Sequence, residues 1–175
     1  IAARDMFGFP LLSVAVDCTA AENNVEMLKL LVKFGADLNP PSSPVVNRPS
    51  YSRVGSPLHN AVVAQVLRQH RGGSGDNFTM IEYLVRAGSD IDSVNMSTDD
   101  PYNPDLNHPS AAPPIPFTPL HFAINQNRVD LALRLASLGA DVNMRVAQDV
   151  PGTREEVLQE LSPLETAVGH NNPRM

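Results

Sequence analysis

Residues 118–124 read Thr-Pro-Leu-His-Phe-Ala-Ile, and this first phrase occurs four times in the chain with small changes. Residues 56–62 read Ser-Pro-Leu-His-Asn-Ala-Val, and residues 162–168 read Ser-Pro-Leu-Glu-Thr-Ala-Val. The most divergent copy, at residues 10–16, reads Pro-Leu-Leu-Ser-Val-Ala-Val. A phrase that returns in this way predicts a repeat architecture, in which each copy is one structural unit.

A second phrase follows the first three copies of the first phrase. Residues 135–143 read Leu-Ala-Ser-Leu-Gly-Ala-Asp-Val-Asn, and related phrases stand at residues 31–39 and 84–92. Two phrases that alternate in a fixed order predict a unit with two elements, and stacked units can then bury a continuous core.

Each residue type in the first phrase suits the start of a helix. In the copy at 118–124, Thr118 can cap the helix by accepting a hydrogen bond from a free backbone N–H, and Pro119 fits the first helical position. Leu120 and Ala123 then lie on one side of the helix, toward the core. The same cap-and-core pattern is expected in the other regular copies, with Ser56 and Ser162 as caps and Leu58 and Leu164 in the core.

The second phrase suits the end of a helix. Its glycine fits the left-handed position that commonly closes a helix, and the apolar residue three positions later folds back onto the apolar face. The glycines are Gly35, Gly88 and Gly139, and the apolar residues are Leu38, Ile91 and Val142. We therefore expect positive φ at Gly139, and we expect Leu131 and Leu135 of the helix before it to be buried with Leu120 and Ala123.

Together the two phrases resemble the ankyrin repeat family. Asp5-Met6-Phe7-Gly8 also resembles the Asp-x-x-Gly turn that introduces such repeats. The resemblance implies an all-α fold, an α-solenoid of helix-turn-helix units with long Pro-rich finger loops. On this interpretation residues 1–175 form a single ankyrin-repeat domain. Its repeats span 5–39, 55–92, 116–143 and an incomplete 161–175, with insertions at 40–54, 93–115 and 144–160.

The insertions distinguish this chain from compact ankyrin repeats. Apolar spacing after Ala61 predicts that the first helix of the second repeat continues to about His70. The first two inter-repeat fingers are rich in proline, which predicts extended backbone without new packed elements. In the third finger Thr153 and Glu156 read as a capping box, so a short helix is expected at 153–160.

Composition limits the kinds of function that the sequence allows. The chain has 175 residues, 42% of them hydrophobic, and a net charge of −6 with a pI near 5.2. This acidity disfavours direct nucleic-acid binding, and no apolar run is long enough to cross a membrane. One cysteine, Cys18, excludes an internal disulfide framework and favours a cytoplasmic or nuclear protein.

No catalytic, cofactor or metal site is indicated. The histidines lack the close spacing of helical metal ligands; they are His59, His70, His108, His121 and His170. His59 and His121 hold the same slot in successive copies, which resembles the structural histidine of ankyrin repeats. Cys18 has no paired cysteine and reads as a small buried apolar residue. We therefore expect no enzyme here.

The resemblance implies a protein-interaction scaffold or adaptor that binds another protein through its first helices and long fingers. Arginine and tyrosine are favoured interface anchors, and long loops on a rigid scaffold often carry binding residues. The expected contacts are a basic set and an acidic finger, namely Arg48, Tyr51, Arg53, Arg68 and Arg71, then Asp99, Asp100, Tyr102 and Phe117. The alternative is that these segments are only solvated spacers.

Two further functions remain open on the sequence. The chain could be the regulatory ankyrin region of a larger enzyme or transcription regulator whose active domain lies outside these residues. It could also be a substrate, because Leu135 with Asn143 and Leu31 with Asn39 resemble ankyrin sites modified by asparaginyl hydroxylase. Finally, the fourth copy of the first phrase lacks a second phrase. We expect either that the polypeptide continues past Met175 or that another subunit covers this end.

Overall fold

The computed structural model describes residues 11–19, 25–40, 56–70, 78–97, 115–149 and 158–169. Within them the helices form consecutive pairs, α1 (Leu11–Thr19) with α2 (Glu26–Lys33), α3 (Pro57–His70) with α4 (Thr79–Ala87), and α5 (Pro119–Asn125) with α6 (Val129–Ser137). A further helix, α7 (Pro163–Gly169), begins a fourth unit. The predicted helical repeat fold is confirmed.

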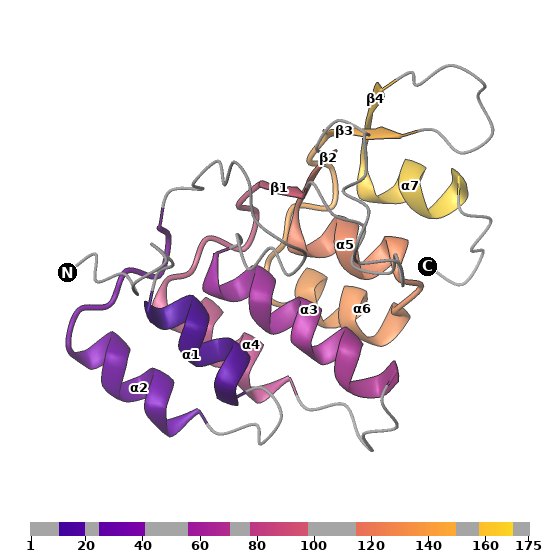
Figure 1. Cartoon of the computed structure of the whole chain (residues 1–175). Helices are drawn as coiled ribbons and strands as arrows, with labels where there is room; N and C mark the ends of the chain where they lie inside the picture. The colour runs from indigo at the N-terminus through magenta and orange to yellow at the C-terminus, as the bar shows by residue number, and fades with distance from the viewer. Residues whose placement is uncertain are drawn as a thin grey trace, which may run out of the picture.

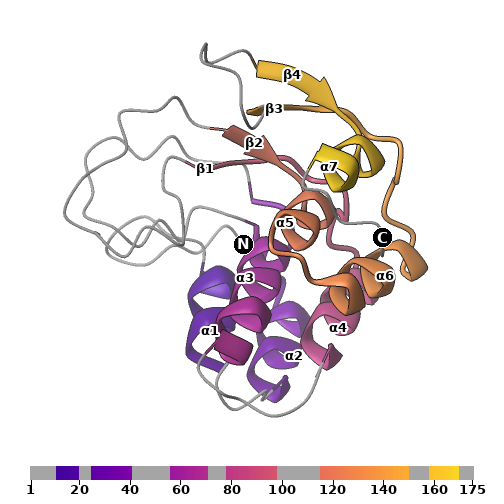
Figure 2. The same ribbon diagram turned by 90° about the vertical axis from the view of Figure 1, so that its right-hand side faces the viewer.

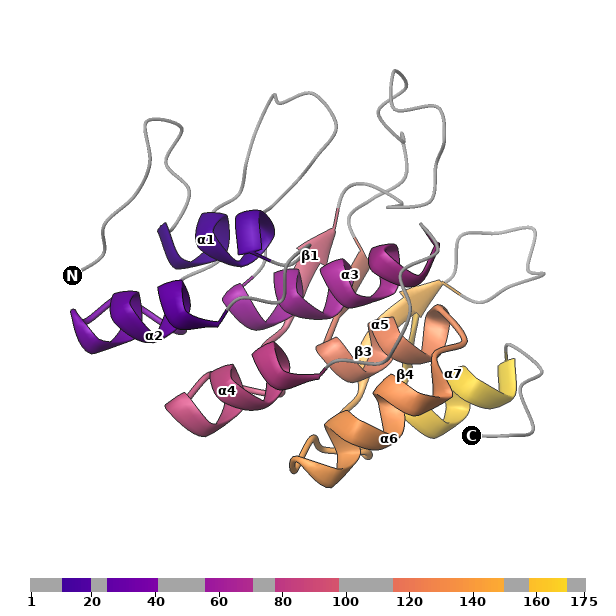
Figure 3. The ribbon, with the colours of Figure 1, turned by 90° about the horizontal axis from the view of Figure 1, so that it is seen from below.

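The first helices of the units stack on one another. α1 contacts α3, α3 contacts α5 and α5 contacts α7, so the array follows the order of the chain (Figure 1). Viewed from below, α2, α4 and α6 form a second row beside the first helices (Figure 3). The core lies between the rows and between successive units, as expected of a solenoid in which each repeat packs on its neighbours.

The core residues come from equivalent positions of each unit. Leu120 and Ala123 of α5 and Leu131 and Leu135 of α6 are buried, as predicted. The residues of the other units in the same core include Leu12, Val16, Leu28, Leu58, Ala61, Val62, Ile81, Leu84 and Ala167. One continuous cluster therefore extends from α1 to α7.

The predicted helix ends are confirmed. Thr118 accepts a hydrogen bond from the backbone N–H of His121 at 3.3 Å, which caps α5. The three glycines after the second helices have positive φ, with 82° at Gly35, 106° at Gly88 and 104° at Gly139. A residue with a Cβ is strained at such φ values, which explains glycine at these positions. α3 does continue to His70.

Two apolar predictions are wrong. Leu164, expected in the core, is 66% exposed, and Val142, expected to fold back onto the apolar face, is 48% exposed. Their counterparts Leu58 and Leu120 are buried, and Leu38 and Ile91 are partly buried against the core, whereas the described residues include no helix after α7.

The residues at the two ends of the second finger pair with each other as strands, and so do those at the two ends of the third. We call these paired ends the feet of the fingers. The proline content did not predict this pairing. β1 (Asn95–Ser97) pairs antiparallel with β2 (Ile115–Phe117), and Asn95 lies opposite Phe117. β3 (Val146–Asp149) pairs antiparallel with β4 (Leu158–Leu161). β2 also contacts β3, so the two ladders lie next to each other (Figure 2).

β4 also corrects the helix expected at 153–160. Residues 158–160 belong to a strand, and residues 153–157 lie outside the described part of the chain. Pairing with β3 therefore prevails over the local helical signal, as tertiary contacts commonly do.

Candidate functional site

Most residues predicted to bind a partner lie outside the described part of the chain. They are Arg48, Tyr51, Arg53, Arg71, Asp99, Asp100 and Tyr102. Arg68 belongs to α3, but its side chain is also outside what is described. Phe117 is the one predicted contact whose surroundings can be given.

Phe117 is half buried in β2 and packs against the core. Its ring centroid lies 5.5 Å from that of His59 in an edge-on arrangement and 5.4 Å from that of Phe122. Aromatic contacts of this geometry stabilise folded structure. Because its ring already packs within the chain, we leave Phe117 out of the proposed partner surface.

His59 joins the first helix of one unit to the foot of the next finger. Its Nε2 lies 3.3 Å from the carbonyl oxygen of Phe117, and its Nδ1 lies 2.9 Å from Ser56 Oγ. A carbonyl oxygen only accepts, so Nε2 carries a proton and donates to it; in the neutral ring, Nδ1 then accepts from the serine hydroxyl.

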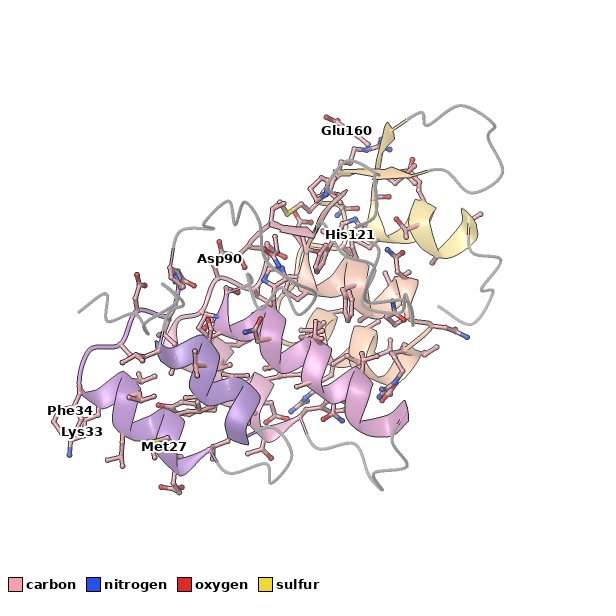
Figure 4. All side chains as sticks on the ribbon, in the orientation of Figure 1. Met27, Lys33, Phe34, Asp90, His121 and Glu160 are labelled. Atoms are coloured by element: carbon pink, nitrogen blue, oxygen red, sulfur yellow. The ribbon has the colours of Figure 1, made fainter. Side chains whose placement is uncertain are left out.

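His121 repeats this arrangement one unit later. Its Nε2 lies 3.2 Å from the carbonyl oxygen of Leu161 in β4, and its Nδ1 lies 2.8 Å from Thr118 Oγ1. Figure 4 shows His121 below the strands that it reaches. The predicted structural role of both histidines is confirmed.

Burial sets the charge of these two rings. Desolvation lowers the pKa of His59 to about 4, and the hydrogen bond to the Phe117 carbonyl only partly opposes it. Desolvation also lowers the pKa of His121. Neither ring has the charge or the exposure of a working acid at neutral pH. Among the residues that the structure describes, no group of three His, Cys, Asp or Glu could hold a metal ion.

The loops after the second helices are also linked from unit to unit. Asn39 donates to the carbonyl oxygen of Gly88 at 3.0 Å and accepts from the backbone N–H of Asp90 at 2.7 Å. One unit later, Asp92 accepts from the backbone N–H of Asp141 at 2.8 Å. These bonds keep successive loops in register.

At the foot of the third finger the polar contacts are exposed. Arg145 donates to the carbonyl oxygen of Glu160 at 2.8 Å and forms an ion pair with Glu165. Glu165 also accepts from the backbone N–H and hydroxyl of Ser162, and these bonds, the backbone one first, lower its pKa. Glu160 itself, in β4, is exposed (Figure 4).

The first helices offer less open surface than the resemblance implied. Residues 119–124 of α5 and 57–62 of α3 are all buried. Open apolar surface lies instead at the two ends of the array. At one end it comprises Met27 and Leu30 of α2 and Phe34 just after that helix; at the other end it comprises Leu133, Val142, Leu164 and Val168. The sequence predicted that Leu164 and Val142 are buried, because the equivalent positions of the other units are apolar, and it gave no prediction for the other five residues.

Two stretches of the chain, residues 8–43 and 117–146, match the family model for the ankyrin repeat. The chain therefore contains ankyrin repeats, and the sequence resemblance is confirmed. Ankyrin repeats generally mediate binding between proteins and are typically not catalytic. No curated protein matches the chain. In the described residues no helix is both long and apolar enough to span a membrane.

Proposed function

We propose, from the premise that residues 8–43 and 117–146 are ankyrin repeats, that this chain is a scaffold or adaptor that binds another protein through its long fingers. We propose further that residues 1–175 act as one repeat domain in the cytoplasm or nucleus, with neither nucleic acid nor membrane as a direct ligand. The net charge of −6 and the single cysteine support this setting.

The observation that carries the proposal is how the fingers are anchored. The second finger leaves through β1 and returns through β2, and the third leaves through β3 and returns through β4. His59 and His121 bind the returning strands at Phe117 and Leu161. Long segments therefore begin and end at fixed places on the helical array, which is the usual setting of binding loops.

The anchors also bring the ends of the second and third fingers together. β2 contacts β3, so the second and third fingers start from adjacent places. A partner can therefore contact both at once, and a surface built from two long fingers can reach the area of about 800 Å² per partner that stable interfaces bury. The proposed contacts are Arg48, Tyr51 and Arg53 of the first finger, Arg68 of α3 with Arg71 just after it, and Asp99, Asp100 and Tyr102 of the second finger.

The test is a comparison of affinity capture from cell extract. The wild-type chain and the triple variant Arg48→Ala, Tyr51→Ala, Arg53→Ala are immobilised at equal density, and captured proteins are quantified by mass spectrometry. The affinity of the most enriched protein is then measured with purified components. We expect the triple variant to bind it at least tenfold more weakly, which is about 1.4 kcal/mol.

A matched control separates the fingers from general surface charge. Arg86 on α4 is an exposed arginine with a 3.6 Å ion pair to Glu82, so Arg86→Ala removes one positive charge away from the fingers. It should leave the affinity unchanged. If the triple variant binds as tightly as the wild type at equal melting temperature, the first finger is not part of the interface.

A further inference from the structure

The two inner strands at the feet of the fingers, β2 and β3, each have a neighbour on both sides. β1 pairs with β2 and β4 pairs with β3, while β2 and β3 contact each other, so the four strands follow the order of the chain (Figure 2). A free strand edge normally pairs with a strand that lies beside it. Among the described residues, however, the ladders form two separate two-stranded sheets. The pairing therefore breaks between β2 and β3.

A proline occupies the side of β2 that faces this break. Pro116 is the middle residue of β2 and lies opposite Met96 of β1. Opposed residues in an antiparallel ladder alternate between pairs that exchange hydrogen bonds and pairs whose backbone groups point away from each other. Proline has no N–H, so the bonded pairs are the two that flank it. They are Asn95 with Phe117 and Ser97 with Ile115. The backbone of Pro116 therefore faces away from β1, toward β3.

The third finger has the same alternation with a different residue in the position of the proline. Phe117 of β2 and Leu161 of β4 each accept a hydrogen bond from a histidine of a first helix, which makes Pro116 and Glu160 equivalent. Ala147 lies opposite Glu160, so its backbone groups face away from β4, toward β2. At Ala147, β3 thus offers an N–H and a carbonyl oxygen, whereas β2 at Pro116 offers only a carbonyl oxygen.

This position is unusual for a proline in a sheet. Prolines in strands are normally confined to edges, where the side without an N–H faces solvent. Here that side faces a second strand. A sheet that continued across β2 and β3 would lack a ladder hydrogen bond at the one residue of β2 that is directed at β3.

We propose that Pro116 is a separator that keeps the second and third fingers as two independent ladders. Each finger is fixed at its own feet, so either ladder can open or tilt without breaking the hydrogen bonds of the other. A residue with an N–H at position 116 would join the four strands into one sheet and couple the two fingers. This separation is a property of the chain alone, and it does not depend on whether the fingers bind a partner.

The variant Pro116→Val tests the separator directly, because valine supplies an N–H and suits a strand. In amide NMR spectra of this variant, we expect a nuclear Overhauser contact between the amides at positions 116 and 147. The amide at position 116 should exchange with solvent at least tenfold more slowly than in an unstructured peptide of the same sequence.

Native-state hydrogen exchange at low denaturant concentrations measures the coupling itself. In the wild type, the amides of the β1–β2 ladder and those of the β3–β4 ladder should open in separate steps, each with its own dependence on denaturant. In Pro116→Val the two sets should open together. The separator thus predicts one cooperative unit in the variant and two in the wild type.

The variant Ile115→Pro is the matched control, one residue earlier in the same strand. The N–H of Ile115 faces β1, so proline at this position should break the β1–β2 ladder and speed exchange of the Ser97 amide at least tenfold. The amides of the β3–β4 ladder should keep their wild-type protection. Neither substitution lies in a helix, so the helical circular dichroism signal of both variants should melt near the wild-type temperature.

Three results would overturn the proposal. The amide at position 116 in a folded Pro116→Val chain could exchange at the unstructured rate, which would show that the proline is not what separates β2 from β3. The two wild-type ladders could open as one unit, which would show that the fingers are already coupled. Finally, Ile115→Pro could leave the Ser97 amide protected, which would reverse the direction assigned to Pro116.

Discussion

The third and fourth copies of the first phrase nearly share a sequence but differ in what surrounds them. Leu120 and Ala123 of α5 are both buried, at 3% and 0% exposed. In α7 the corresponding Ala167 is buried at 3%, whereas Leu164 is 66% exposed. The side of α7 that faces α5 is complete, and the opposite side is open. The phrase therefore specifies a helix and its orientation, while burial depends on the helices that pack against it.

The residue at the fourth position of the phrase, His121 or Glu165, also differs between the two copies in what it contacts. His121 reaches forward to the carbonyl oxygen of Leu161 at the foot of the next finger. Glu165, in the same slot of α7, binds back to Ser162 within its own turn and to Arg145 of the preceding finger. Histidine at this position forms a hydrogen bond to the finger that follows it in the chain. Glutamate at the same position bonds only to its own turn and to the preceding finger.

The largest expected difference between the two copies is in their leucines. Leu120→Ala should lower the free energy of unfolding by about 2–5 kcal/mol, because it leaves a cavity in a packed core. Leu164→Ala should change it by less than about 0.5 kcal/mol, because the side chain is already exposed. Urea unfolding of the two variants measures both values. Equal losses would mean that Leu164 is covered in solution.

The next largest expected effect is a loss of stability in acid, through the buried ring of His59. The pKa of His59 is lowered from 6.5 to about 4, so below pH 6.5 the unfolded chain binds a proton that the folded chain does not. Stability from this group is complete above pH 6.5 and is lost as the pH falls toward 4, by on the order of 3 kcal/mol. Urea midpoints across this range, with NMR titration of the ring, measure the effect. A His59 ring that titrates near pH 6.5 in the folded chain would contradict it.

Removing the capping hydroxyl groups of Thr118 and Ser162 should change stability by a smaller amount, and by different amounts in the two copies. Thr118→Ala should cost about 1 kcal/mol, because the buried hydroxyl caps α5 and also donates to His121. Ser162→Ala should cost less, because its bonds with Glu165 are exposed. Thr118→Ser keeps the hydroxyl and serves as the control in thermal unfolding. A serine variant as unstable as the alanine variant would show that the methyl group matters, and that the cap does not.

An effect similar in size to that of the caps is expected in the loops after the second helices. Asn39→Ala removes two bonds to the next unit and should cost about 0.5–1.5 kcal/mol. Its counterpart Asn143 bonds to Asp141 through its backbone N–H, which alanine retains. Asn143→Ala should therefore have no measurable effect. Hydrogen exchange at the Asp90 amide reports the loss directly, and unchanged protection there in Asn39→Ala would contradict this role.

The helical part of the fold could be predicted because its determinants are local. Thr118 caps α5 within one turn, and Gly139 closes α6 through its own φ angle. The strands could not be predicted, because pairing between Asn95 and Phe117 joins residues that are distant in the sequence. The capping-box signal of Thr153 and Glu156 is local too, and pairing of β4 with β3 prevailed over it at residues 158–160.

The candidate site could be predicted less well. A fit of Arg48 or Tyr51 to a partner depends on a surface outside this chain, so these residues stay predictions. Phe117 reads as an exposed aromatic in the sequence, yet His59 and Phe122 half-enclose it. The sequence around Leu133 does not indicate that this residue is exposed. The equivalent residue of α4 is Glu82, which forms an ion pair with Arg134 of the next unit.

Because strand pairing fixes both ends of the second finger, the length of this finger can change without a change in the helical array. His59 and the pairing of β1 with β2 fix residues 95–97 and 115–117, and both anchors lie outside residues 98–114. Doubling the length of a flexible loop costs only about 0.6 kcal/mol in closure entropy. Insertions between residues 98 and 114 should therefore be tolerated by the folded repeats. The second finger is thus the place where a reporter peptide, or a new binding sequence, can be introduced without redesigning the core.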